Sequence, residues 1–180
     1  MDNLDKIKKI SKNFEVLCSA LLVCVPLYYL VFWVFINVLP TSFITVNTAV
    51  VPLVDNEVSP ALQMAGFVAS LLPLSALTYI LLKVRRLFGH YKQGEIFSFS
   101  HVELFKKTAW GLVFWVVFSM IYDSAKSIIF SFGNPPGSRV VTVGFGSSEI
   151  TTLITAGMVL MIAWVMDEGR LLHEETTLTI

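Results

Sequence analysis

The chain has 180 residues, of which 55% are apolar and only 14% are charged, whereas an ordinary soluble domain has about 25% charged residues. Its 13 basic and 13 acidic side chains cancel to a net charge of zero, so the charge balance does not indicate a nucleic-acid-binding protein or an acidic tail. The composition argues against a soluble globular domain and favours a protein embedded in lipid.

Four charge-free stretches divide the chain, and each contains a segment that can cross much or all of a bilayer about 30 Å thick. The stretches are residues 16–54, 58–82, 108–122 and 150–166. We therefore predict an all-α membrane protein with a single domain, residues 1–180, that forms a four-transmembrane-helix bundle. The predicted helices cover about residues 14–39, 60–82, 100–130 and 148–173.

Lysine and arginine are distributed unevenly along this layout. The N-terminal tail, the stretch from Lys83 to Lys107 around the connection between helices two and three, and the end of helix four together carry all of them except Lys126 and Arg139. Because basic residues beside a span are retained in the cytoplasm, we predict that both termini are cytoplasmic. The same side chains attract anionic headgroups, which makes the lipid bilayer an expected partner.

The two outward connections have a different composition. Residues 42–51 and the segment from Arg139 to Phe145 are rich in β-branched side chains and alternate in part between apolar and polar residues, as strands do. They predict a small outward-facing β cap, and ordered loops without strands are the alternative.

Residues that usually carry catalytic, metal or haem chemistry are sparse. Cys18 and Cys24 lie about 120° apart around the first helix and do not bond to each other. The histidines fall in cytoplasmic or boundary positions, with none at membrane depth, whereas a haem held between helices needs histidines there. We expect them at the surface, with proton sensing as the alternative. They are His90, His101 and His173.

No hydrolase, zinc-protease or phosphate-binding motif is recognisable in the sequence. We therefore predict no catalytic residue, no metal and no cofactor, and a protein that is not an enzyme.

Asp123 and Lys126 form the one predicted charge pair within a helix. Their i, i+3 spacing allows an ion pair, and Asp123 lies roughly 24 Å along the helix from Lys107, near the outer interface. An intramembrane pair suggests a gate or an ion-coupling site. The alternative is an interfacial pair that ends the apolar stretch.

Small residues recur on the second helix at Ala61, Ala65 and Ala69, with Gly66 and Ser70 alongside. Small residues let membrane helices approach closely. This face predicts a tight neighbour, which is either another helix of this chain or a second copy in a homo-oligomer.

The region between helices two and three is too apolar for a free loop and must pack on something. Gly94 is the expected turn residue. Ser100 and Glu103 fit a capping box that starts helix three, and this box fixes the angle at which the chain enters that helix.

The C-terminal region combines acidic and apolar residues. Helix four is expected to leave the bilayer through Leu172, and residues 176–180 to form a short extended segment. Its acids lie opposite basic side chains of the preceding region, so the tail either folds back over that region or captures a cytosolic partner. The acids are Asp167, Glu168, Glu174 and Glu175, and the bases are Lys92, Lys106 and Lys107.

At these two segments the chain resembles the bacterial four-span inner-membrane proteins catalogued as domain-of-unknown-function family 2975. The resemblance rests on Leu87-Phe88-x-x-Tyr91-x-x-Gly94-Glu95-Ile96-Phe97-Ser98 and on Met166-x-Glu168-Gly169-x-Leu171 through Glu174-Glu175-x-x-Leu178-Thr179-Ile180. It implies a bacterial inner-membrane location and supplies no catalytic residue. Members are often encoded beside small helix-turn-helix regulators, which implies a signalling role.

Two functional hypotheses follow. The first is a regulatory protein whose cytoplasmic face binds a cytosolic partner such as a helix-turn-helix regulator. The second is a small oligomeric transporter or channel component that uses Asp123 and Lys126. The candidate partner-binding residues are Leu87, Phe88, Tyr91, Gly94, Glu95, Ile96, Phe97, Glu174, Glu175, Leu178, Thr179 and Ile180.

Overall fold

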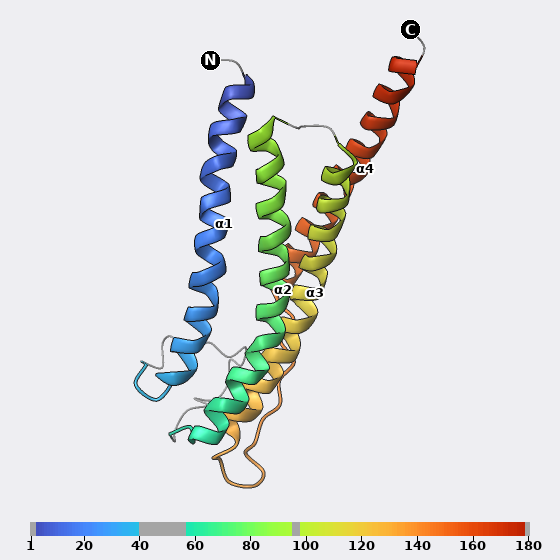
Figure 1. Cartoon of the computed structure of the whole chain (residues 1–180). Coiled ribbons are helices and arrows are strands. Elements are labelled where there is room, and N and C mark those ends of the chain that lie inside the picture. The colour runs from blue at the N-terminus through green and yellow to red at the C-terminus, as the bar shows by residue number, and fades with distance from the viewer. Residues whose placement is uncertain (1–2, 40–56, 95–97, 179–180) are drawn as a thin grey trace.

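The computed structural model describes residues 3–39, 57–94 and 98–178, with side chains up to Leu171. They form four helices and no strand: α1 (Asn3–Val34), α2 (Pro60–Gln93), α3 (Phe99–Ser131) and α4 (Ser147–Leu178) (Figure 1). Each helix contains an apolar window long enough to cross a membrane. The predicted all-α, four-span architecture is therefore confirmed.

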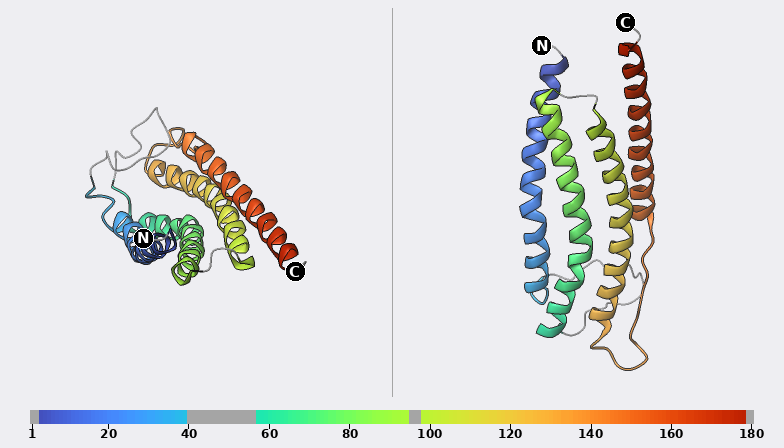
Figure 2. Two further views of the ribbon diagram at one scale, coloured as in Figure 1. Left: turned by 90° about the horizontal axis from the view of Figure 1, so that it is seen from above. Right: turned by 45° about the vertical axis from the view of Figure 1, so that its right-hand side comes forward.

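The helices run up and down in chain order, and each packs on its neighbours in the sequence: α1 on α2, α2 on α3, and α3 on α4. Viewed along their length they form a curved row with α1 and α4 at its edges (Figure 2). We call the end with the N-terminus, the α2–α3 turn and the last residues of α4 the terminal end, and the opposite end the loop end.

Helix α2 is longer than predicted. It begins at Pro60, where the Ser59 hydroxyl accepts a hydrogen bond from the Leu62 N–H, and ends at Gly94, which adopts a left-handed conformation with φ of 86°. The predicted end at Leu82 is wrong because the residues between Leu82 and Gly94 include no proline and a single glycine, Gly89, which the helix tolerates. The basic residues after Leu82 mark where the apolar stretch ends, whereas the helix itself continues.

Helix α3 starts differently from the prediction. Its N-cap is Ser98, and Ser100 lies inside the first turn, so the predicted capping box of Ser100 and Glu103 does not form. The Ser98 hydroxyl lies 3.1 Å from Nδ1 of His101, and Glu103 instead pairs with Lys107 at 2.8 Å. The histidine ring takes the hydroxyl that would otherwise cap the helix.

Helix α4 also exceeds its predicted length. Its backbone is helical through Leu178, so the extended segment predicted from Thr176 is wrong over its described part. The guanidinium of Arg170 lies over the ring of Phe99, the first residue of α3, at 5.5 Å. The turns after Arg170 therefore extend past α3 by roughly 12 Å, and through Leu178, the last described residue, the chain continues as helix and does not fold back over the α2–α3 region (Figures 1 and 2).

The α3–α4 connection contains no strand between Arg139 and Phe145, where part of the β cap was predicted. The segment instead runs back along α3 and bonds to serine side chains. The Ser131 hydroxyl accepts from the Val140 N–H at 3.2 Å and donates to its carbonyl at 3.1 Å, and the Ser127 hydroxyl accepts from the Thr142 N–H at 3.0 Å. The other predicted strand segment, residues 42–51, lies outside the described residues.

A buried cluster at the loop end, which we call the aromatic core, takes half of its six members from aromatic residues. The six buried side chains of the cluster are Trp33, Ile36, Val58, Tyr122, Ile129 and Phe130. Trp33 Nε1 donates a hydrogen bond to the Tyr122 hydroxyl at 3.0 Å, and a Cβ atom placed on Gly66 would collide with the Trp33 ring. The small-residue face thus packs on α1 of the same chain through Gly66, while Ala61 and Ala65 are exposed and do not form the close contact.

Candidate functional site

Among the described residues of the terminal end, a ring contact and an ion pair join α1 to α2. Phe14 stacks on Phe88 with ring centroids 4.9 Å apart, and Lys92 Nζ lies 3.1 Å from a carboxylate oxygen of Glu15. Phe88 is one of the predicted partner-binding residues, and its ring is already used to hold two helices of this chain together.

The α2–α3 contact is built around His101. This ring is fully buried, stacks on Tyr91 at 4.9 Å and lies 5.3 Å from the ring of His90. The expected surface position of this histidine is therefore wrong. A signal in the sequence could have placed His101 correctly. It lies three residues after Ser98 and beside the apolar residues Val102 and Leu104, a pattern that marks a buried face of α3.

The α3–α4 contact at this end is ionic. Lys106 Nζ lies 3.1 Å from one carboxylate oxygen of Asp167, and Arg170 lies 3.3 Å from the other. Of the acids and bases expected to attract each other, the structure pairs Lys106 with Asp167. Lys92 instead pairs with Glu15, and Lys107 pairs with Glu103. The bridge fixes α4 beside α3 just below the turns of α4 that extend beyond it.

The predicted partner-binding residues fall into three groups. Leu87 is buried, Phe88 and Tyr91 pack within the chain, and Gly94 caps α2, so these four position helices. Glu174, Glu175 and Leu178 belong to the extending turns of α4, of which only the backbone is described. Outside the described residues lie Glu95, Ile96, Phe97, Thr179 and Ile180.

The Asp123–Lys126 pair lies toward the loop end. Its nitrogen and oxygen are 2.6 Å apart, and the Lys126 and Asp123 side chains are 13% and 19% exposed. Lys126 Nζ also lies 4.8 Å from the ring centroid of Tyr122. Counting back along α4 from the Arg170–Phe99 contact puts Ser147, where α4 starts, at about the level of Tyr122. The pair is therefore shielded, and it lies level with the beginning of α4.

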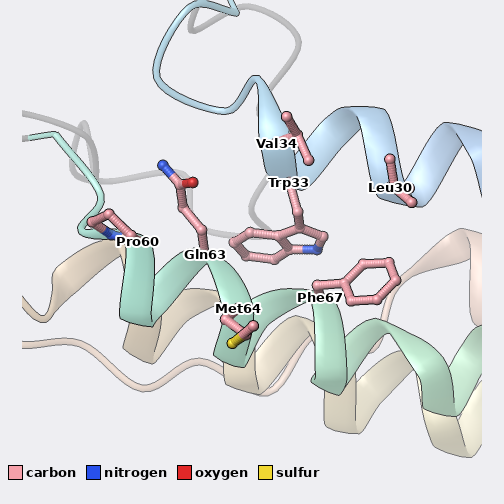
Figure 3. Close-up of a pocket in the computed structure, with 7 residues that line it drawn as sticks. All are labelled: Leu30, Trp33, Val34, Pro60, Gln63, Met64 and Phe67. Carbon is pink, nitrogen blue, oxygen red and sulfur yellow. The ribbon is translucent and has the colours of Figure 1, made fainter.

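Two cavities lie between α1 and α2, and sequence reasoning found neither. One, of about 340 Å³, is apolar and lies at the loop end, where the Trp33 indole reaches from α1 toward α2 (Figure 3). Its lining residues are Leu30, Trp33, Val34, Pro60, Gln63, Met64 and Phe67. The other, of about 400 Å³, lies toward the terminal end and is lined mainly by polar and charged residues. Its lining residues are Glu15, Leu82, Arg85, Arg86, Gly89, His90 and Gln93.

A metal site is not apparent in the part of the chain that the structure describes, since no three His, Cys, Asp or Glu side chains there come close enough to hold an ion. The free thiols of Cys18 and Cys24 are separate, the first buried and the second exposed.

Four apolar helices of this length define a multi-pass membrane protein. Over residues 13–180 the chain matches the family described as Protein of unknown function (DUF2975), and it belongs to that family. The resemblance found at the α2–α3 region and the C-terminus is thereby confirmed. No curated protein and no solved structure matches the chain.

Proposed function

We propose that this chain is a non-enzymatic regulatory membrane protein that binds a cytosolic protein through the extending turns of α4. The family to which it belongs has no assigned activity, so the proposal rests on the geometry of the terminal end. Members of the family are often encoded beside helix-turn-helix regulators, which suggests such a regulator as the partner.

The orientation that this function needs is supported by charge. All basic residues except Lys126 and Arg139 lie on α1, on α2 and α3 near their shared turn, or on α4 at the terminal end. Lys and Arg beside spans favour the cytoplasmic side. We infer that the terminal end faces the cytosol, where cytosolic proteins can reach the extending turns of α4, and the family resemblance suggests the inner membrane of a bacterium.

The observation that carries the proposal is the length of α4. Arg170 lies over the first residue of α3, and the helix continues through Leu178. A helix that leaves its neighbour behind offers a surface for helix-in-groove recognition, in which the partner supplies the groove. The acids Glu174 and Glu175 give this segment a negative charge suited to a basic partner.

Two other contacts at the terminal end hold in place the part of α4 from which the extending turns start. The Lys106–Asp167 bridge joins α4 to α3, and the Tyr91–His101 stack joins α3 to α2. A partner that binds the extension therefore meets a helix whose base is held, which lowers the entropy lost on binding.

Co-purification from native membranes tests the proposal. A chain truncated after His173, with an N-terminal tag, should retain the proposed helix-turn-helix regulator at least about tenfold less than the full chain does. Membrane insertion should stay the same. Asp123→Asn is the matched control, because it changes a charge at the far end of the molecule and should leave capture intact. Equal capture by the truncated chain would contradict the proposal.

A second candidate function is a small oligomeric transporter or channel component, and the shielded Asp123–Lys126 pair favours it. The exposed side of α2 with Ala61 and Ala65 would then join copies, since four helices in an open row enclose no pathway by themselves. Asp123→Asn should change ion flux in proteoliposomes under this hypothesis. A strictly monomeric protein in bilayers would count against it.

A further inference from the structure

The cavity at the terminal end between α1 and α2 has the chemistry of an anionic-ligand site. We propose that it binds the phosphate headgroup of an anionic phospholipid. The proposal requires that the chain spans a membrane, but it is independent of any cytosolic partner.

The positive charge comes from two arginines. Arg85 and Arg86 both line the cavity and both are exposed. Within the described part of the chain, neither of them forms an ion pair, whereas Lys92, Lys106 and Lys107 each have a carboxylate partner. Two adjacent guanidinium groups offer several N–H donors to phosphate oxygens, and their charges are not already neutralised.

The one acidic side chain of the lining does not oppose an anion. Glu15 contributes from α1, but its carboxylate is paired with Lys92 at 3.1 Å. The pair also holds α1 beside α2 along one side of the cavity. The local charge of the site therefore remains positive.

Room for a headgroup is provided by Gly89. A Cβ atom placed on this residue would meet no atom within 4 Å. Leu82, Arg86, Gly89 and Gln93 follow at intervals of four, three and four residues and so share one face of α2. The glycine thus leaves an open space in the middle of a polar stripe, where a larger side chain would fill it.

The position of the cavity decides between a lipid and a soluble phosphate compound. Leu82 is the last residue of a charge-free stretch that begins at Val58, so the cavity spans the boundary between the apolar part of α2 and its basic extension. This is the level of headgroups in a bilayer. A lipid there places its phosphate by the arginines and its acyl chains along the apolar surface of the same helix.

The test uses the full-length protein purified in mild detergent and incubated with phosphatidylglycerol or phosphatidylcholine, with bound lipid counted by native mass spectrometry. The wild-type chain should hold phosphatidylglycerol about tenfold better than phosphatidylcholine. The double variant Arg85→Gln with Arg86→Gln should lose this preference.

Gly89→Leu tests the cavity without changing charge. It fills the open space while leaving both arginines in place, and it should also abolish the preference. Because leucine favours a helix over glycine, the variant should unfold at the same temperature as the wild type or higher. It therefore stays informative even if the double arginine variant fails to fold.

The matched control removes two charges from the same end but outside the cavity, as Lys12→Gln with Lys83→Gln. Lys83 lies on the same helix, with its amine 4.8 Å from the centroid of the Tyr79 ring. The preference for phosphatidylglycerol should survive in this control. If the control loses as much binding as the arginine variant, or if Gly89→Leu keeps it, the attraction is diffuse and the site is refuted.

Glycerol phosphate without acyl chains separates the two sources of the ligand. It should displace bound phosphatidylglycerol only weakly, because the acyl chains contribute to binding. Displacement at equal concentration would identify a soluble phosphate compound as the ligand and overturn the assignment to a lipid.

Discussion

The two ends of the helix row are held together by different kinds of contact. At the loop end, α1 and α2 meet where Trp33 lies against Gly66, and α3 joins through the Trp33–Tyr122 hydrogen bond and the stacked ring of Phe130, 5.9 Å away. The amide of Asn37 pairs with both backbone polar groups of Val58 at 2.9 and 3.0 Å. This end is closely fitted, and most of its polar groups are satisfied within the protein.

At the terminal end, by contrast, α1 meets α2 and α3 meets α4 through partly exposed ion pairs and single ring contacts, while α2 and α3 share a buried contact around His101. Exposed ion pairs contribute little to stability. In lipid, helix association depends on close packing and hydrogen bonds, because apolar burial between helices is not favoured over contact with lipid. The difference teaches that α1 is held mainly at the loop end, while the ion pairs that join α1 and α4 to their neighbours at the terminal end can change at low cost.

Gly66→Leu is the variant with the largest expected effect and the most direct test of the difference between the two ends. The new side chain must displace the Trp33 ring, which is buried in the aromatic core, and we expect a loss of about 3 kcal/mol in the free energy of unfolding. Thermal unfolding in detergent, followed by circular dichroism, measures it. Ala65→Leu is the control on the adjacent exposed position and should be nearly neutral. A similar loss in both variants would show that the α1–α2 fit at Gly66 is not what stabilises this end.

The second prediction concerns the serines that bind the α3–α4 connection. Ser127→Ala leaves the N–H of Thr142 without its acceptor, and Ser131→Ala does the same to Val140. Each should cost about 1–2 kcal/mol, measured by the same unfolding experiment. Ser124→Ala should cost little, because that hydroxyl bonds only to the Met120 carbonyl of its own helix. An equal loss of stability in all three variants would show that the hydrogen bonds from Ser127 and Ser131 to the connection are not what stabilises it.

The smallest effect is expected at the terminal end. Lys106→Gln removes one partner of Asp167 but leaves Arg170 beside it, so the loss should be under about 1 kcal/mol and should shrink further in high salt. Lys107→Gln, which breaks a pair within one helix, is the control and should be smaller still. A loss as large as that of Gly66→Leu would invert the comparison of the two ends.

The sequence predicts the four spans well because charge-free stretches and basic borders report directly on the bilayer. It does not predict the helix lengths, since Lys83, Arg85 and Arg86 end an apolar stretch without ending a helix. It also misplaces the close contact of α2: Ala65 and Gly66 are both small, and only the position of Trp33 on a distant part of the chain decides which of them is covered.

The candidate site shows the same division. The attraction between the acids of α4 and the bases near α3 is predictable from charge, but its realisation as Lys106–Asp167 depends on the register of the two helices. The burial of His101 and the use of Phe88 and Tyr91 within the chain depend on helices that continue where a loop was expected. The cavity beside Gly89 follows from the same continuation, because its polar stripe exists only on a helix.

The return of residues 138–146 along α3 has a consequence for the opposite end of the molecule. Because the connection runs back along α3 before α4 starts, the whole of α4 is shifted along its own axis toward the terminal end. An extended residue covers about 3.3 Å, so a connection shortened by two residues between Gly144 and Ser147 would draw the C-terminal turns inward by up to roughly 7 Å. The length of an outer connection thereby governs how far the protein reaches on its other side.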